Sequence, residues 1–133
     1  MSDMHISLLA TALAGLIAIA LGIRCGMVRT REKVFHGDGG SPLMLKRMRA
    51  QANFVEYTPF ALALIVVLDL MEQQGYALGL SALAFLIGRI AHAIGMDADA
   101  GGTTWPRALG MLLTLPILLG WAIWAILLAF RLI

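Results

Sequence analysis

Long apolar stretches limit what this chain can fold into more than any other feature of its sequence. Three of them, residues 6–23, 76–94 and 109–130, are close to the roughly 20 residues that a helix needs to cross the hydrocarbon core of a bilayer. A fourth, residues 59–68, is long enough only if its helix begins well before it. With 60% of its 133 residues hydrophobic and 14% charged, the sequence predicts an all-α integral membrane protein. Residues 1–133 are expected to form a single domain of four transmembrane helices.

The start of the second helix is marked by turn formers that end at Ser41 and Pro42. A serine directly before a proline is typical of an N-cap followed by the first helical residue. If this helix runs to about Gln73, it has about 31 residues and a length on the order of 46 Å at 1.5 Å per residue. This exceeds the membrane core, so we expect the helix to tilt or to project into the cytoplasm.

Basic residues gather in and around the first loop, whereas the second loop, residues 69–75, has acids and no bases. They are Arg24, Arg29, Arg31, Lys33, Lys46 and Arg47. Because cytoplasmic loops carry an excess of Lys and Arg, we expect the first loop in the cytoplasm and both termini outside it. Topology and attraction to anionic lipid explain these charges, so membrane lipid is an expected partner and nucleic acid is not.

Polar and charged side chains interrupt the second helix between Arg49 and Glu56. A charge near the middle of a membrane helix costs about 2.5–3.5 kcal/mol on insertion scales, so it usually faces a bundle interior or a wet cavity. At 100° per residue, Arg49, Asn53 and Glu56 fall within about 60° of one another, with Tyr57 at the flank. Arginine can bind a carboxylate, glutamate can accept an ammonium, and asparagine can do either. The stripe therefore predicts a site for a zwitterionic ligand, or else a structural network in which these residues satisfy one another.

Arginines on all four predicted helices lie near one membrane level, at the expected cytoplasmic end. They are Arg29 or Arg31, Arg49, Arg89 and Arg107. This convergence favours an anionic ligand, although positive residues also collect at this level for topological reasons. Apolar residues flank Arg89, so we expect its partner to be Glu56 or another acid in the bundle. His92, on the same side, is interpreted as a packing residue, a partner of Glu56 or a proton carrier.

Cys25 is interpreted as a small buried hydrophobe, with a redox role as the alternative. The loop that begins at Asp97 starts like a calcium-binding loop but has Ala108 where the last acidic ligand is needed, so a solvated turn is expected. No metal site is predicted.

Four motifs together resemble one family, and the resemblance covers nearly the whole chain. They are His36-Gly-Asp-Gly-Gly40, Lys46-Arg-Met-Arg-Ala-Gln-Ala-Asn-Phe-Val-Glu-Tyr-Thr-Pro59, Arg89-Ile-Ala-His92 and Pro106-Arg-Ala-Leu-Gly110. The chain resembles the membrane-associated proteins in eicosanoid and glutathione metabolism (MAPEG), and its short loops resemble the bacterial branch. The resemblance implies a homotrimer of four-helix bundles in the bacterial inner membrane. Glutathione would be the co-substrate, bound between subunits at the cytoplasmic end.

The resemblance also implies which residues contact glutathione. On the second helix they match Arg49, Gln51, Asn53, Glu56 and Tyr57. The cation that ends the first helix matches Arg29 or Arg31, and a family arginine on the third helix matches Arg89. Arg107 matches the arginine held to stabilise the glutathione thiolate. Two tyrosines that contact glutathione in the leukotriene-forming synthases fall at His92 and Met96, which argues against the same pose.

The expected function is a glutathione transferase or peroxidase that detoxifies hydrophobic electrophiles. A free thiol has a pKa of about 8.5, so a cation beside the sulfur raises the thiolate fraction at neutral pH. The thiolate would attack an electrophilic carbon or reduce a lipid hydroperoxide that enters from the bilayer. The alternative is a non-catalytic protein that binds a lipid or glutathione in the same cavity. A small transporter is disfavoured, since the sequence shows neither a repeated half nor helices broken at the midplane.

Overall fold

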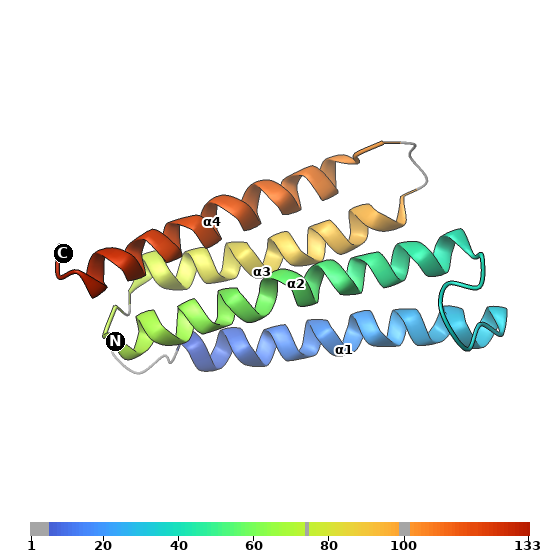
Figure 1. The fold of residues 1–133 in the computed structure, drawn as a ribbon, viewed down its shortest axis with the longest axis horizontal. Coiled ribbons are helices and arrows are strands. Elements are labelled where there is room, and N and C mark those ends of the chain that lie inside the picture. Colours follow the sequence, from blue (N-terminus) through green and yellow to red (C-terminus); the bar gives the residue numbers. More distant parts are fainter. Residues whose placement is uncertain (1–5, 74, 99–101) are drawn as a thin grey trace.

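A computed structural model of the chain describes residues 6–73, 75–98 and 102–133. These residues form four antiparallel helices, α1 (Ile6–Glu32), α2 (Pro42–Leu70), α3 (Tyr76–Asp97) and α4 (Trp105–Ala129). All four are long and apolar enough to cross a membrane. The predicted all-α, four-helix membrane fold is therefore confirmed. Helix α1 begins and α4 ends at the same end of the bundle (Figure 1).

The helix boundaries follow the local chemistry of the chain. Helix α1 continues past its apolar stretch to Glu32, and Arg29 and Arg31 in its last turn complement the negative C-terminal end of the helix dipole. The predicted start of α2 is confirmed, because the Ser41 side chain accepts a hydrogen bond of 3.1 Å from the Met44 N–H. This helix ends at Leu70, before the predicted Gln73, and Glu72 just beyond it has a left-handed φ of 59°.

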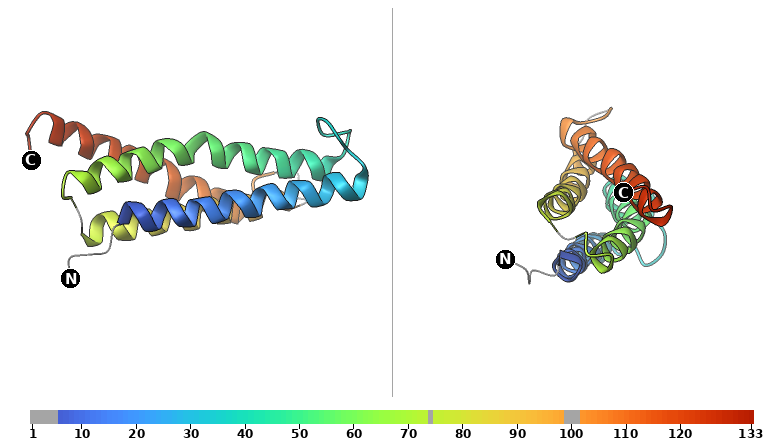
Figure 2. Two further views of the ribbon diagram at one scale, coloured as in Figure 1. Left: turned by 90° about the horizontal axis from the view of Figure 1, so that it is seen from below. Right: turned by 90° about the vertical axis from the view of Figure 1, so that its left-hand side faces the viewer.

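Helices α2 and α3 form the centre of the bundle, since each of them contacts all the others. Within the described residues α1 and α4 do not contact each other, because α2 and α3 lie between them. Helix α4 runs obliquely to the other three helices (Figure 2). The fully buried core includes Ile65 and Leu68 from α2 and Leu78 and Phe85 from α3. Many other large apolar side chains are exposed, as is expected of helix faces that contact lipid. Cys25 is buried beside Val28 and Met44, in agreement with its interpretation as a hydrophobe.

Glycines set how closely α3 and α4 approach each other. A Cβ atom added to Gly110 would lie 2.6 Å from the Gly88 carbonyl oxygen and 2.6 Å from Cβ of His92. A Cβ atom added to Gly88 would lie 2.9 Å from Cβ of Leu113. Both helices therefore need glycine at this crossing, which brings the α4 backbone within reach of side chains on α3.

Asp97, the last residue of α3, connects three helices at this end of α3. Arg24 from α1 donates a hydrogen bond to its carboxylate, and Nε of Arg47 from α2 lies 3.1 Å from its Oδ1. Nearby, the Lys46 ammonium donates to the carbonyl of Ala98 at 3.3 Å. Several of the basic residues that mark this end in the sequence thus have structural partners.

Candidate anion-binding site

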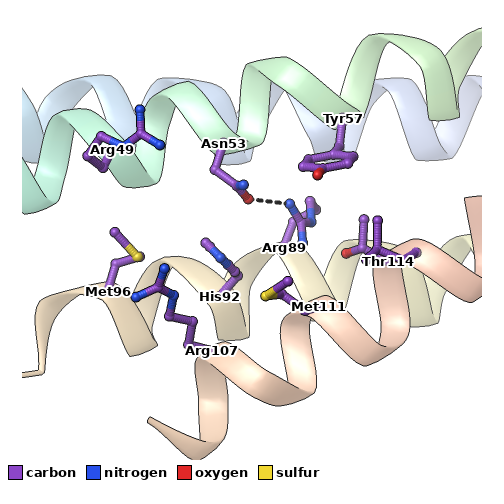
Figure 3. A pocket seen from close by; sticks show the side chains of 10 residues that line it. Arg49, Asn53, Tyr57, Arg89, His92, Met96, Arg107, Met111 and Thr114 are labelled. Atoms are coloured by element: carbon purple, nitrogen blue, oxygen red, sulfur yellow. Dashed lines mark hydrogen bonds between the residues drawn. The ribbon is translucent and has the colours of Figure 1, made fainter. Parts of the chain in front are cut away.

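A pocket of about 140 Å³ lies between α2, α3 and α4, toward the end of the bundle where α2 and α4 begin (Figure 3). Helix α2 contributes Arg49, Asn53 and Tyr57, and α3 contributes Arg89, His92 and Met96. Helix α4 contributes Arg107, Met111, Thr114 and Leu115. None of the described residues that line this pocket is acidic, so its wall is cationic.

The predicted stripe on α2 is divided by the structure. The residues that face the pocket are four apart along the helix: Arg49, Asn53 and Tyr57. Glu56 does not line the pocket and is exposed on the outside of the chain. Gln51 points toward α1, with its Nε2 atom 3.9 Å from where a Cβ atom on Gly22 would lie.

Arg89 is buried, and its partners differ from the acid that the sequence led us to expect. Its Nη1 donates a hydrogen bond of 2.6 Å to Oδ1 of Asn53, and its Nη2 donates one of 3.2 Å to the Gly110 carbonyl. Its guanidinium carbon lies 5.4 Å from the ring centre of Tyr57 and 5.8 Å from that of Phe85. The expectation of Glu56 or another acid beside Arg89 is therefore wrong. An amide, a carbonyl and two aromatic faces stabilise the charge instead.

Two arginines at the mouth of the pocket have no such partners. Arg49 is exposed, and Arg107 is half-buried with a fully buried Nε atom. Within the described part of the chain, neither guanidinium makes a hydrogen bond or an ion pair. Figure 3 shows the two side chains reaching the same end of the pocket from α2 and α4. These two cations are therefore free to bind an anion.

The two candidate cations at the end of α1 lie away from this pocket. Nη1 of Arg29 donates to the Gly37 carbonyl at 3.0 Å and to the Val34 carbonyl at 3.4 Å, which closes the loop between α1 and α2. Arg31 is exposed and forms an ion pair of 3.3 Å with Glu32. Within one chain, the geometry gives Arg29 a structural role and leaves Arg31 on the surface.

The sequence indicated His92 as a candidate site residue but did not indicate Gly110, Met111 or Thr114. His92 is buried and packs against Gly110, and no hydrogen bond joins it to Glu56 within the described chain. Gly110 was missed as a site residue, although its carbonyl accepts hydrogen bonds from both Arg89 and Thr114, the latter at 2.7 Å. Its place in the motif Pro106-Arg-Ala-Leu-Gly110 was the available signal. Met111 and Thr114 carried no such signal.

Comparisons with known proteins agree with this architecture. The model of the MAPEG family matches residues 7–127, a stretch that includes nearly all of the four helices. The chain is also similar to Inner membrane protein YecN of Escherichia coli strain K12 and to the protein of the same name in an Escherichia coli O6:H1 strain. Each is 26% identical to it over 90 residues, which cover 68% of this chain and 69% of the relative.

Proposed function

This chain belongs to the MAPEG family, and we propose that it is a glutathione transferase or peroxidase acting on hydrophobic electrophiles. The observation that carries the proposal is that Arg49 and Arg107 face one pocket from two helices and have no partner among the described residues. Such a pair attracts an anion. Glutathione offers two carboxylates and, after deprotonation, a thiolate.

The membrane location follows from the helices and from the relatives. Four helices could span a bilayer, and both relatives are named as inner membrane proteins. This supports a multi-pass protein of the bacterial inner membrane. With the basic first loop in the cytoplasm, both termini lie outside, and the pocket lies near the cytoplasmic side, where glutathione can reach it.

Two features support sites that lie between subunits, and the resemblance to the family implies that the subunits form a homotrimer. The pocket in one chain, at about 140 Å³, is smaller than the roughly 300–1,000 Å³ of most small-molecule sites. Glu56, the middle residue of α2, lies between the pocket residues Asn53 and Tyr57 along the chain and is exposed. Contact with lipid at this level is costly for a carboxylate. A second copy that covers this face would enlarge the site and shield Glu56. Glu56 could then accept the glutathione ammonium.

The chemistry proposed for this site needs only groups of the chain and its two substrates. Arg49 and Asn53 would bind a carboxylate, and Arg107 would lie beside the sulfur. Arg107 is in the first turn of α4, where the positive end of the helix dipole adds to its own charge. The thiolate would form a bond to an electrophilic carbon while the leaving group departs with its electron pair. The electrophile would arrive from the bilayer past the exposed side chains of Met111 and Leu115.

A conjugation assay tests the proposal directly. The purified protein in detergent, given glutathione and a chlorinated aromatic substrate, is expected to form the thioether faster than protein-free detergent does. Calorimetry under the same conditions is expected to show glutathione binding. Absence of both turnover and binding contradicts the proposed function.

Binding without turnover would support the second candidate, a non-catalytic protein that holds glutathione or a lipid in this cavity. His92 and Met96 favour this candidate, because they line the pocket at the positions where the leukotriene-forming synthases have tyrosines. A thioether has no hydrogen-bond donor, and an imidazole donates through a ring N–H in place of the phenolic O–H.

Replacing Glu56 by glutamine is expected to weaken glutathione binding by about tenfold, since a hydrogen bond to a charged group contributes roughly 1.5–3 kcal/mol. Turnover at saturating glutathione should stay within a few-fold, because the ammonium is far from the sulfur. Calorimetry and the dependence of rate on glutathione concentration measure the two effects. Glu72→Gln, an equivalent change of an exposed acid just beyond the C-terminal end of α2, is the matched control. Equal affinities for the two variants would contradict the role of Glu56.

A further inference from the structure

The contact between Arg89 and Asn53 fixes which end of the Asn53 amide faces Arg89. We propose that Arg89 is a positioning residue that makes Asn53 a hydrogen-bond donor to a carboxylate of the ligand, and that Arg89 does not bind the ligand itself. The inference rests on the proposed function in one respect, since the ligand is taken to be glutathione.

The direction of the amide follows from the chemistry of its neighbour. The oxygen and nitrogen of an amide are often assigned from their hydrogen-bond partners. A guanidinium has donors and no acceptor, so the atom of Asn53 that lies 2.6 Å from Nη1 of Arg89 must be the oxygen. The two N–H groups of Asn53 therefore point away from Arg89, and Asn53 is one of the side chains that line the pocket (Figure 3).

Arg89 is held too firmly to serve as a mobile ligand contact. Only 3% of it is exposed, and its second amino group donates to the Gly110 carbonyl on α4. The aromatic rings of Tyr57 and Phe85 lie near its guanidinium. The Gly110 carbonyl also accepts from Thr114, so the acceptor that anchors Arg89 is itself fixed. One rigid connection thus runs from α4 through Arg89 to the amide on α2.

The orientation of Asn53 has a consequence for ligand selection. With its oxygen turned to Arg89, Asn53 directs its N–H groups away from that residue, and the neighbouring guanidinium groups of Arg49 and Arg107 have donors and no acceptor. This part of the site therefore takes a hydrogen-bond acceptor with negative charge and repels an ammonium. A carboxylate of glutathione fits it, and the ammonium must lie elsewhere.

Asn53→Asp separates the positioning role from a merely structural one, because aspartate keeps the acceptor for Arg89 but loses the N–H donors. We expect its melting temperature in detergent to equal or exceed that of the wild type, and that of Asn53→Ala to be lower. Glutathione affinity in calorimetry should fall by at least about tenfold in Asn53→Asp. The preference for glutathione over its diethyl ester, in which both carboxylates are masked, should shrink or reverse. Gln73→Glu, a change of amide to acid at the far end of the bundle, should leave affinity and preference unchanged.

Two results would overturn the inference. One is wild-type glutathione affinity and ester discrimination in Asn53→Asp, since Asn53 would then not donate to the ligand. The other is a melting temperature of Asn53→Asp below that of Asn53→Ala, since Arg89 would then not need an acceptor there. A wild-type protein that binds no glutathione contradicts the proposed function and the ligand role of Asn53. The order of melting temperatures still decides whether Arg89 orients the side chain at position 53.

Discussion

Gly110→Ala is expected to separate α3 from α4 and to abolish glutathione binding. The new methyl group would lie 2.6 Å from both the Gly88 carbonyl oxygen and Cβ of His92, and 2.8 Å from the His92 backbone nitrogen. Overpacking typically costs 1–3 kcal/mol. Two of these neighbours are backbone atoms that cannot rotate away, so we expect a loss of about 3 kcal/mol, at the upper end of that range. Because Arg89 reaches the Gly110 carbonyl across this contact, moving α4 also breaks the connection that orients Asn53.

Gly120→Ala provides the matched control for this change, because it lies on the same helix and a Cβ atom there would meet nothing within 4 Å. Alanine favours a helix over glycine by up to about 1 kcal/mol, so this variant should be as stable as the wild type or slightly more stable. Thermal unfolding in detergent and glutathione calorimetry measure both effects. Wild-type stability and binding in Gly110→Ala would show that the contact between α3 and α4 is looser than the structure has it.

The number and place of the helices could be predicted because the membrane imposes a simple rule on the sequence. Each apolar stretch needs about 20 residues, and a serine before a proline marks a helix start. The end of α1 was less predictable. Once the helix has left the apolar region, polar residues such as Arg24 and Glu32 can continue it, and hydropathy alone gives no signal of where it stops.

The candidate site was predictable in its charges and unpredictable in its partners. A helix wheel places Arg49 and Asn53 on one face, but whether Glu56 or Tyr57 completes that face depends on how α2 is rotated against α3 and α4. That rotation is set by side-chain packing between helices. The sequence likewise shows that Arg89 needs a partner. It does not show that a backbone carbonyl can be one, since the Gly110 carbonyl becomes accessible to Arg89 only because two glycine-containing helices approach closely.

Arg107→Ala is expected to lower turnover near neutral pH by on the order of 10²-fold, the loss seen when one preorganised group that stabilises a developing anion is removed. Without the cation, the glutathione thiol returns toward its ordinary pKa of about 8.5, so less of it is ionised at pH 7. Glutathione affinity should stay within a few-fold of the wild type, because Arg49 and Asn53 still hold a carboxylate. The effect therefore belongs to the rate at saturating glutathione.

The pH dependence of turnover distinguishes this role of Arg107 from a general loss of structure. The rate of Arg107→Ala should rise steeply as the pH passes the pKa of the free thiol and should approach the wild-type rate above it. A variant with a damaged fold would stay slow at every pH. Arg107→Lys keeps a charge and should recover part of the neutral rate, whereas Arg131→Ala, at the far end of the bundle, should match the wild type throughout. Full neutral activity in Arg107→Ala would assign thiolate stabilisation to another group, and Arg49, at the same end of the pocket, would then be the first to test.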